Sequence, residues 1–213
     1  MRKALIVWGG WPGHEPEISA NICATMLRDE GFDVRIETRT AAFADKSIRD
    51  LSLIIPVVTM SKIEKDECVM LTGAVRDGVG LAGFHGSMCD SFRDSVDYQF
   101  MTGGQWVAHP GNIIDFSVNV KDRDDPVMQG IDDFPFRSEQ YYMHVDPSNH
   151  VLATTTFSGE HAHWTKGVTM PAVWKHHHGI GRVFYSALGH VSAEFNVPQM
   201  RTIFRRGMLW AAR

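Results

Sequence analysis

The sequence contains few cysteines, no long apolar segment and no strong excess of either charge. Its three cysteines, Cys23, Cys68 and Cys89, form neither a CxxC pair nor an even-numbered disulfide framework, so we expect reduced thiols in a cytoplasmic protein. No apolar run approaches the roughly 20 residues that cross a bilayer, and the first residues lead into a strand-like run rather than a signal peptide. The formal net charge of −4 includes no basic excess. We therefore expect neither nucleic acid nor a membrane as a partner.

Repeats, low-complexity tracts and linkers are also absent, as are the HExxH and CxxC signatures of common zinc sites. The 213 residues include 44% apolar and 22% charged side chains, a composition typical of a globular domain. A chain of this length can bury a large core without disulfide or metal crosslinks. We therefore predict a single domain over residues 1–213. The high counts are 11 histidines and 6 tryptophans, which suit acid–base chemistry, metal binding and stacking on sugar rings.

The first half of the chain alternates between strand and helix patterns. Apolar or alternating runs predict four strands, at residues 4–8, 34–37, 51–58 and 80–84. Helical patterns follow three of these strands, from Pro16, through Met70 and around residues 92–100. We expect Pro56 to limit the far end of the third strand. Strands separated by helices of this length predict a mainly parallel sheet with helices on both faces.

The second half is richer in strands. Alternating segments lie at residues 113–120 and 151–155. Residues 171–175 and 181–186 read as a hairpin whose turn contains the triplet His176–His178, and the chain closes with an amphipathic helix. The fold class is therefore α/β: an open, mainly parallel sheet with a strand-rich second half.

The segment Gly83-Phe84-His85-Gly86-Ser87 carries the sharpest chemical signal. A strand that ends in Gly-x-residue-Gly and turns directly into a helix has the pattern of a nucleophile elbow, which presents its central side chain at the carboxyl end of the sheet. Acyl-transfer enzymes place Ser or Cys there, whereas His85 cannot form an ester or thioester. Ser87 and Cys89 are displaced from the central position. The alternative is a tight glycine turn in which the histidine is incidental.

Two further histidines follow predicted strands. His190 comes just after the strand at 181–186, where it is placed to act as an acid, a base or a ligand. Glu194 either orients His190 or lies on the next helical turn. His14 and Glu15 occupy the loop after the first strand, beside Trp11. We expect His14 and Trp11 to face the crevice, while Glu15 either joins them or only favours the positive end of the next helix.

Polar and aromatic residues in the middle of the chain complete the candidate set. Glu139, in the segment Arg137 to His144, is a candidate catalytic carboxylate, metal ligand or partner of Arg137, and Tyr141 follows it. His109 lies in a proline-glycine loop. Three imidazoles and one carboxylate suit a zinc-like divalent ion, and the candidate ligands are His14, His85, Glu139 and His190. We interpret the histidine triplet as a solvated turn.

Once these pieces are assembled, the sequence resembles the ThuA-like family, the trehalose utilisation proteins, over essentially its whole length. The matching segments are Gly-Gly-x-x-x-His14, Gly-Phe-His85-Gly-Ser with Asp90-Ser91-Phe92, Ser-Glu139-Gln-Tyr-Tyr, Met170-Pro171-Ala172-Val173-Trp174, and Gly-Ile-Gly-Arg182-Val-Phe-Tyr-Ser-Ala-Leu-Gly-His190. The resemblance implies a flavodoxin-like fold of the class I glutamine amidotransferase type that has lost the amidotransferase cysteine. It also implies a role in the catabolism of trehalose and related glucosides.

The resulting hypothesis is an enzyme that acts on trehalose-type disaccharides or their 3-keto derivatives, by cleavage or isomerisation. The expected catalytic residues are His85, His190 and Glu139, and the expected sugar-binding residues are His14, Trp11, His109, Ser87 and Tyr141. No cofactor is required by the sequence, although a divalent metal fits the donors. The expected partner is a small sugar, and a homo-oligomer is plausible. The alternatives are a non-catalytic sugar-binding or regulatory protein and a hydrolase that uses Ser87 or Cys89.

Overall fold

The computed structural model describes all residues, 1–213, and is built around a nine-stranded sheet. The strand order is β2-β1-β3-β4-β11-β10-β9-β6-β7. Its parallel part contains β1 (Lys3–Gly10), β2 (Asp33–Glu37), β3 (Leu53–Thr59), β4 (Gly80–Phe84) and β11 (Gly181–Ser186). Its antiparallel part contains β10 (Thr169–His178), β9 (His150–Thr156), β6 (Ile113–Val120) and β7 (Phe134–Glu139). The predicted α/β class with a strand-rich second half is therefore confirmed.

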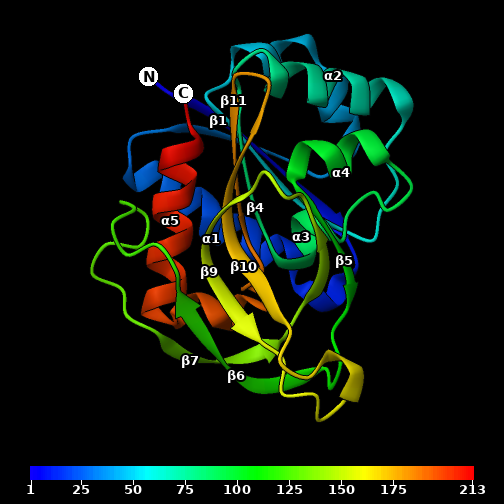
Figure 1. The fold of residues 1–213 in the computed structure, drawn as a ribbon. Helices are drawn as coiled ribbons and strands as arrows, with labels where there is room; N and C mark the ends of the chain where they lie inside the picture. Colours follow the sequence, from blue (N-terminus) through cyan, green and yellow to red (C-terminus); the bar gives the residue numbers. More distant parts are fainter.

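Helices cover both faces of the sheet (Figure 1). One face packs against α1 (Pro16–Asp29) and α5 (Pro198–Ala211), and the other packs against α2 (Lys65–Arg76) and α4 (Val96–Thr102). Strand β1 shows why helices are needed on both faces. Its residues Ala4 and Ile6 pack into the core on one face, and Leu5 and Val7 pack into the core on the other. A strand buried on both sides needs apolar residues at every position. None of the helices is long and apolar enough to cross a membrane.

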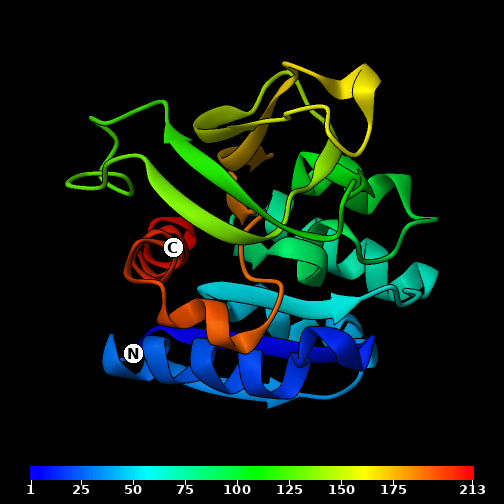
Figure 2. The ribbon, with the colours of Figure 1, turned by 90° about the horizontal axis from the view of Figure 1, so that it is seen from below.

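The last parallel strand joins the two halves of the molecule. Strand β11 pairs with β4 on one side and with β10 on the other, so a late segment lies in the middle of the sheet. Figure 2 shows this arrangement, with the orange strands between the blue-to-cyan half and the green-to-yellow strands. The carboxyl ends of β1, β4 and β11 therefore lie on the same side of the molecule, beyond the ends of the parallel strands. Open α/β folds bind their ligands there.

The elbow pattern predicted a helix directly after β4, whereas two short strands were not predicted from the sequence. Helix α3 (His85–Cys89) starts directly at the end of β4, and β5 (Gly104–Ala108) and β8 (Tyr142–Val145) form a separate two-stranded sheet. Strand β7 was also unforeseen, since Pro135 interrupts its pattern. Proline is tolerated there because β7 is the edge strand of the large sheet.

The expectation that Pro56 limits the third strand is wrong. Pro56 is buried inside β3 and pairs with Val7 of β1. Pairing between β3 and β4 stops at Ile54, so Pro56 stands where β3 has a hydrogen-bonded neighbour on one side only. A residue without an N–H is tolerated at such a position.

The interpretation of the histidine triplet as a turn is also wrong. His176, His177 and His178 belong to β10, and the hairpin turn is formed by Gly179 and Ile180. Side chains alternate along a strand, so His176 is buried while His177 is exposed. Burial lowers the pKa of His176 below its usual value, and the nearby Asp146 only partly opposes this effect.

The burial of His176 predicts a pH-dependent stability. The folded state binds fewer protons than the unfolded state just below pH 6.5, so the free energy of unfolding falls as the pH drops through that range. We expect His176→Gln to make this dependence shallower, by at most about 1.4 kcal/mol per pH unit. Urea unfolding between pH 5 and 7.5 measures it, with His177→Gln as the exposed control. Equal slopes in the wild type and both variants would contradict the prediction.

Candidate functional site

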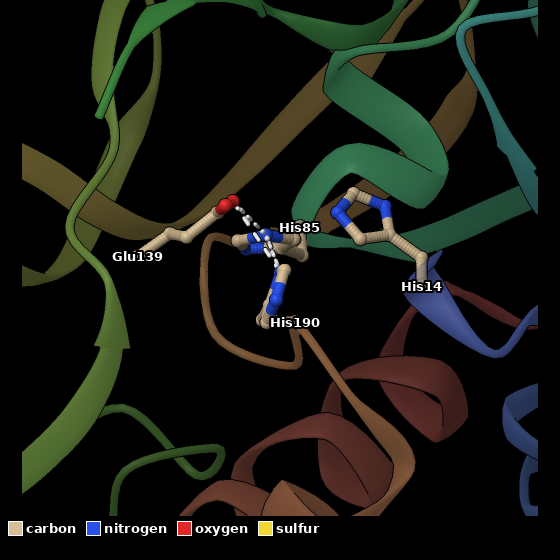
Figure 3. Close-up of side chains that lie close together, drawn as sticks. All are labelled: His14, His85, Glu139 and His190. Carbon is tan, nitrogen blue, oxygen red and sulfur yellow. Dashed lines mark hydrogen bonds and ion pairs between the residues drawn. The ribbon is translucent and has the colours of Figure 1, made fainter. Parts of the chain in front are cut away.

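Four side chains from distant parts of the sequence converge at the carboxyl edge of the sheet. His14 ends the short helix Pro12–His14 after β1, His85 follows β4, His190 follows β11, and Glu139 is the last residue of β7. Figure 3 shows the four side chains close together, with Glu139 opposite the three imidazole rings. Their potential ligand atoms all lie within 4.8 Å of one another. We call these four residues the histidine–glutamate cluster.

The backbone at His85 has the strained geometry of an elbow. Its φ angle is 44°, in the left-handed region that non-glycine residues rarely adopt. Two glycines allow the sharp turn, because a Cβ atom at Gly83 would lie 2.3 Å from the Met88 sulfur and one at Gly86 would lie 2.6 Å from Cε1 of His14. The predicted nucleophile-elbow pattern therefore corresponds to a strand–turn–helix that presents an imidazole.

Gly86 gives a direct test of this packing. We expect Gly86→Ala to destabilise the fold by about 1–3 kcal/mol, because the added methyl group overlaps His14 and lies 2.9 Å from the Tyr141 hydroxyl. Gly9→Ala is the matched control, since its Cβ atom would meet only the Thr38 carbonyl at 3.8 Å. Chemical denaturation measures both changes. A Gly86→Ala protein as stable as Gly9→Ala would show that the elbow is loosely packed.

His85 is the centre of the hydrogen-bond network. Its side chain is fully buried, and its Nδ1 lies 2.9 Å from the Ala187 carbonyl oxygen. Its Nε2 lies 3.1 Å from Oε2 of Glu139 and 3.3 Å from Nδ1 of His190. The same Glu139 oxygen is 3.4 Å from His190 Nδ1. Tyr141 stacks on the His85 ring at a centroid distance of 3.9 Å and fixes its plane.

Electrostatics keep Glu139 ionised and His14 neutral. Burial opposes the charge on Glu139, but hydrogen bonds from His190 and His85 and their positive charge outweigh it, so the pKa of Glu139 is well below its usual value. Burial, followed by repulsion from His85 and His190, lowers the pKa of His14 to about 3. The Nδ1 of His14 is held 2.8 Å from the Thr59 hydroxyl. His14 is therefore a neutral imidazole at neutral pH.

Two glutamates hold the loops of the cluster in place. Glu194 accepts hydrogen bonds from the backbone N–H groups of Gly189 and His190, so it shapes the loop and does not contact the His190 ring. Glu15 accepts the backbone N–H of Ser192 and thereby ties the β1 loop to the His190 loop. Glu194 thus lies on the short helix Ser192–Asn196 that follows His190, as one of its two considered roles had it, and Glu15 is the residue that precedes α1; both carboxylates also bind backbone groups of the His190 loop.

A cavity of about 550 Å3 lies against the cluster, within the ~300–1,000 Å3 typical of small-molecule sites. The predicted site residues in its wall are Trp11, His14, His109, Glu139 and Tyr141. His109 Nε2 is 3.6 Å from Oε1 of Glu139, and Trp11 is 44% exposed. His85 and His190 are not part of this wall but contact its residue Glu139. The structure thus brings most of the predicted site residues to one place.

Several wall residues were missed in the sequence, namely Met60, Asp90, Arg93, Trp106 and Asn112. Arg93 donates two hydrogen bonds to the buried Asp90, at 2.6 and 2.9 Å, and its guanidinium covers one face of Trp106. The sequence could have indicated this pair, because Asp90 and Arg93 are three residues apart and directly follow α3.

Ser87 and Cys89 do not join the cluster. Ser87 is buried in α3, and its side chain makes no hydrogen bond to the cluster residues. Cys89 is fully enclosed, and burial raises the pKa of its thiol far above the usual range. A buried thiol with a raised pKa is a poor nucleophile. The geometry therefore offers no nucleophile near the elbow.

These features define an open, flavodoxin-like α/β protein whose elbow carries an imidazole instead of a nucleophile. The chain belongs to the ThuA family, described as trehalose utilisation, whose sequence profile matches residues 3–211. The comparison with curated proteins gives no match.

Solved structures support the fold. A ThuA-like protein from Parabacteroides merdae is 18% identical over 99% of this chain and 89% of its own, with a TM-score of 0.80. One from Bacteroides uniformis is also 18% identical, over 99% and 91% of the two chains, with a TM-score of 0.81. A β-galactosidase from Bacillus circulans is 14% identical over 99% of this chain but only 30% of its own, with a TM-score of 0.62. At these identities the likeness concerns the fold alone.

Proposed function

We propose that the protein is an enzyme that cleaves the glycosidic bond of 3-keto derivatives of trehalose-type disaccharides by acid–base chemistry. The single observation that carries this proposal is the imidazole at the elbow, hydrogen-bonded to an ionised glutamate at the wall of a cavity. The family's description, trehalose utilisation, supports the substrate class. A ketone at C3 acidifies the proton on C2, so that a positioned base can start an elimination.

Two other reactions fit the geometry less well. A glutaminase needs a nucleophile that forms a thioester, and His85 cannot supply one. A conventional glycosidase needs two carboxyl groups across the bond, one of them protonated. The two carboxyl groups in the cavity wall are Asp90 and Glu139. Asp90 is engaged by Arg93 through both oxygens, and Glu139 is held ionised by its histidines.

Glu139 is the best-placed proton acceptor. Its Oε2 is held by His85 and His190, whereas its Oε1 makes no hydrogen bond and lies near His109 at the cavity wall. In the proposed reaction Oε1 takes the proton from C2, the electron pair forms the C1–C2 double bond, and the C1–O bond breaks. The proton passes through His109 to the leaving oxygen. Addition of water to the unsaturated ketone then completes a net hydrolysis.

The cavity wall offers a surface for the sugar. Trp11 packs edge-to-face on His14 at a centroid distance of 4.8 Å and remains partly exposed. Arg93 covers one face of Trp106, so Trp11 is the aromatic side chain more available for stacking on a pyranose ring. Tyr141 is fixed by its contact with His85. These contacts support a neutral carbohydrate ligand.

An NMR time course with trehalose and, separately, 3-keto-trehalose tests the proposal. We expect the purified protein to consume the keto sugar and leave trehalose unchanged, because only the ketone acidifies the C2 proton. Consumption of neither sugar, together with a ligand-induced rise in melting temperature, would overturn the catalytic proposal in favour of a sugar-binding protein. Cleavage of trehalose itself at a comparable rate would contradict the eliminative route.

A further inference from the structure

Three potential ligand atoms meet at the centre of the histidine–glutamate cluster, namely His85 Nε2, His190 Nδ1 and Glu139 Oε2. The Nδ1 of His85 faces the carbonyl oxygen of Ala187, which can only accept a hydrogen bond, so Nδ1 carries the proton of that ring. In a neutral His85 the Nε2 atom is therefore a lone pair. It points at a carboxylate oxygen 3.1 Å away and at another imidazole nitrogen 3.3 Å away. A lone pair does not attract a carboxylate oxygen, so the contact between His85 Nε2 and Glu139 Oε2 is favourable only when a proton or a cation lies between the two atoms.

The spacing of these atoms is that of ligands around one metal ion. Ligand atoms placed 2.0–2.1 Å from a tetrahedral zinc ion are separated from one another by about 3.3 Å. The observed separations among His85 Nε2, Glu139 Oε2 and His190 Nδ1 are 3.1, 3.3 and 3.4 Å. Two histidines and one glutamate also form the donor set of several catalytic zinc sites.

We infer that His85, His190 and Glu139 bind a divalent cation of the zinc type, with His14 as a fourth and weaker donor. His14 lies within 4.8 Å of the other ligand atoms, farther than direct coordination of one ion requires. It also lines the cavity, so a ligand in the cavity could reach the ion on this side, either by displacing the weaker His14 donor or as a fifth ligand. The role of this cation in catalysis rests on the proposed function, whereas its binding does not.

The surroundings of the three ligands resemble the outer shell of a metal site. Metal-bound histidines commonly donate their second ring N–H to a backbone carbonyl or a side-chain oxygen. The Ala187 carbonyl has this relation to His85, and the Thr59 hydroxyl has it to His14. Glu194 fixes the loop that carries His190. These contacts select the ring orientations before any ion binds.

A bound cation would also complete the proposed chemistry. Removal of a carbon-bound proton by a carboxylate requires strong stabilisation of the enolate that forms. A cation held by His85, His190 and Glu139 would polarise a C3 carbonyl oxygen that reaches it from the cavity. Glu139 would bind the ion through Oε2 and keep Oε1 free to accept the proton.

A second group of possible ligands serves as a control. Asp122, Asp125 and His150 also lie close together, but His150 already pairs with Asp122, and Asp125 pairs with Lys175. Each charged group there has a protein partner of opposite charge or a hydrogen bond. We therefore expect no tight metal site at that position.

Metal content after chelation and reloading tests the inference. The full-length protein is dialysed against EDTA, reloaded with Zn2+ or Co2+, and analysed by mass spectrometry and, for Co2+, by visible absorption. We expect one ion per chain, and a loss of roughly nine-tenths of it in His85→Ala and in the isosteric Glu139→Gln. His14→Ala is expected to bind with lower affinity, and His150→Ala to bind as the wild type. Circular dichroism identifies any variant that fails to fold.

The outcomes separate this inference from the proposed function. A wild-type protein that binds no Zn2+ or Co2+ would overturn the metal site and would indicate that His85 is protonated and ion-paired with Glu139. Equal binding by wild type and Glu139→Gln would also overturn it. Turnover of the keto sugar in EDTA would then leave the proposed function intact, whereas metal binding without turnover would leave the metal site intact.

Discussion

Replacement of Glu139 by glutamine is expected to lower the turnover of 3-keto-trehalose by about 10²–10⁴-fold, the usual contribution of a general base. Glutamine keeps the shape of the side chain but cannot accept the C2 proton. It also removes the negative charge that His85 and His190 face at 3.1 and 3.4 Å. The expected effect is on kcat more than on KM, because the carboxylate acts mainly in the transition state.

The control for this prediction is Glu160→Gln. Glu160 is an exposed carboxylate outside the cluster and outside the cavity wall, so its loss changes the same net charge without touching the site. We expect this variant to retain wild-type rates in the NMR assay. Turnover by Glu139→Gln within threefold of the wild type would remove Glu139 from the mechanism.

Replacement of Lys175 by methionine is expected to give the largest loss of stability, about 3–5 kcal/mol. Lys175 and Asp125 form a salt bridge in which both side chains are 7% exposed, and the ammonium group also lies 4.7 Å from the centre of the Trp210 ring. Methionine fills a similar volume but leaves the Asp125 carboxylate buried with only a backbone N–H, from Val127, as its partner. An unpaired buried charge is strongly destabilising.

Two further variants identify the cause of this loss. Asp125→Asn in the Lys175→Met background removes the buried charge and keeps the hydrogen bond to Val127, so we expect stability to recover in part. Arg137→Ala breaks the exposed pair with Asp115 and is expected to cost less than about 1 kcal/mol. Urea denaturation measures all three proteins. If Lys175→Met costs no more than Arg137→Ala, the pair contributes little to stability.

The sequence predicted the parallel half of the fold well because its strands, apart from the edge strand β2, are buried on both faces. Strands β1, β3 and β4 are continuous apolar runs bounded by turn residues, so their positions and their common direction follow from the pattern. The convergence of His14, His85 and His190 follows in turn, since all three come just after the carboxyl ends of parallel strands.

The position of Glu139 could not be derived in this way. It ends an antiparallel edge strand that four strands separate from β4, so the strand order and the path of the paired strands β6 and β7 together bring it to His85. No local pattern encodes strand order among β9, β6 and β7. Asp90, Arg93 and Trp106 lie in the cavity wall because of the path that the chain takes after α3. The short polar segments there carry no pattern that predicts this path. The buried His176 was missed because three consecutive histidines resemble a turn.

The central claim is that this site moves a carbon-bound proton, and a substrate isotope effect tests it most directly. The measurement compares the rates at which the protein consumes 3-keto-trehalose with hydrogen and with deuterium at C2. Abstraction of that proton by Glu139 predicts a clearly slower reaction of the deuterated sugar, with loss of the label to solvent. Cleavage at the same rate for both sugars, with the deuterium retained at C2 in the product, would contradict the account.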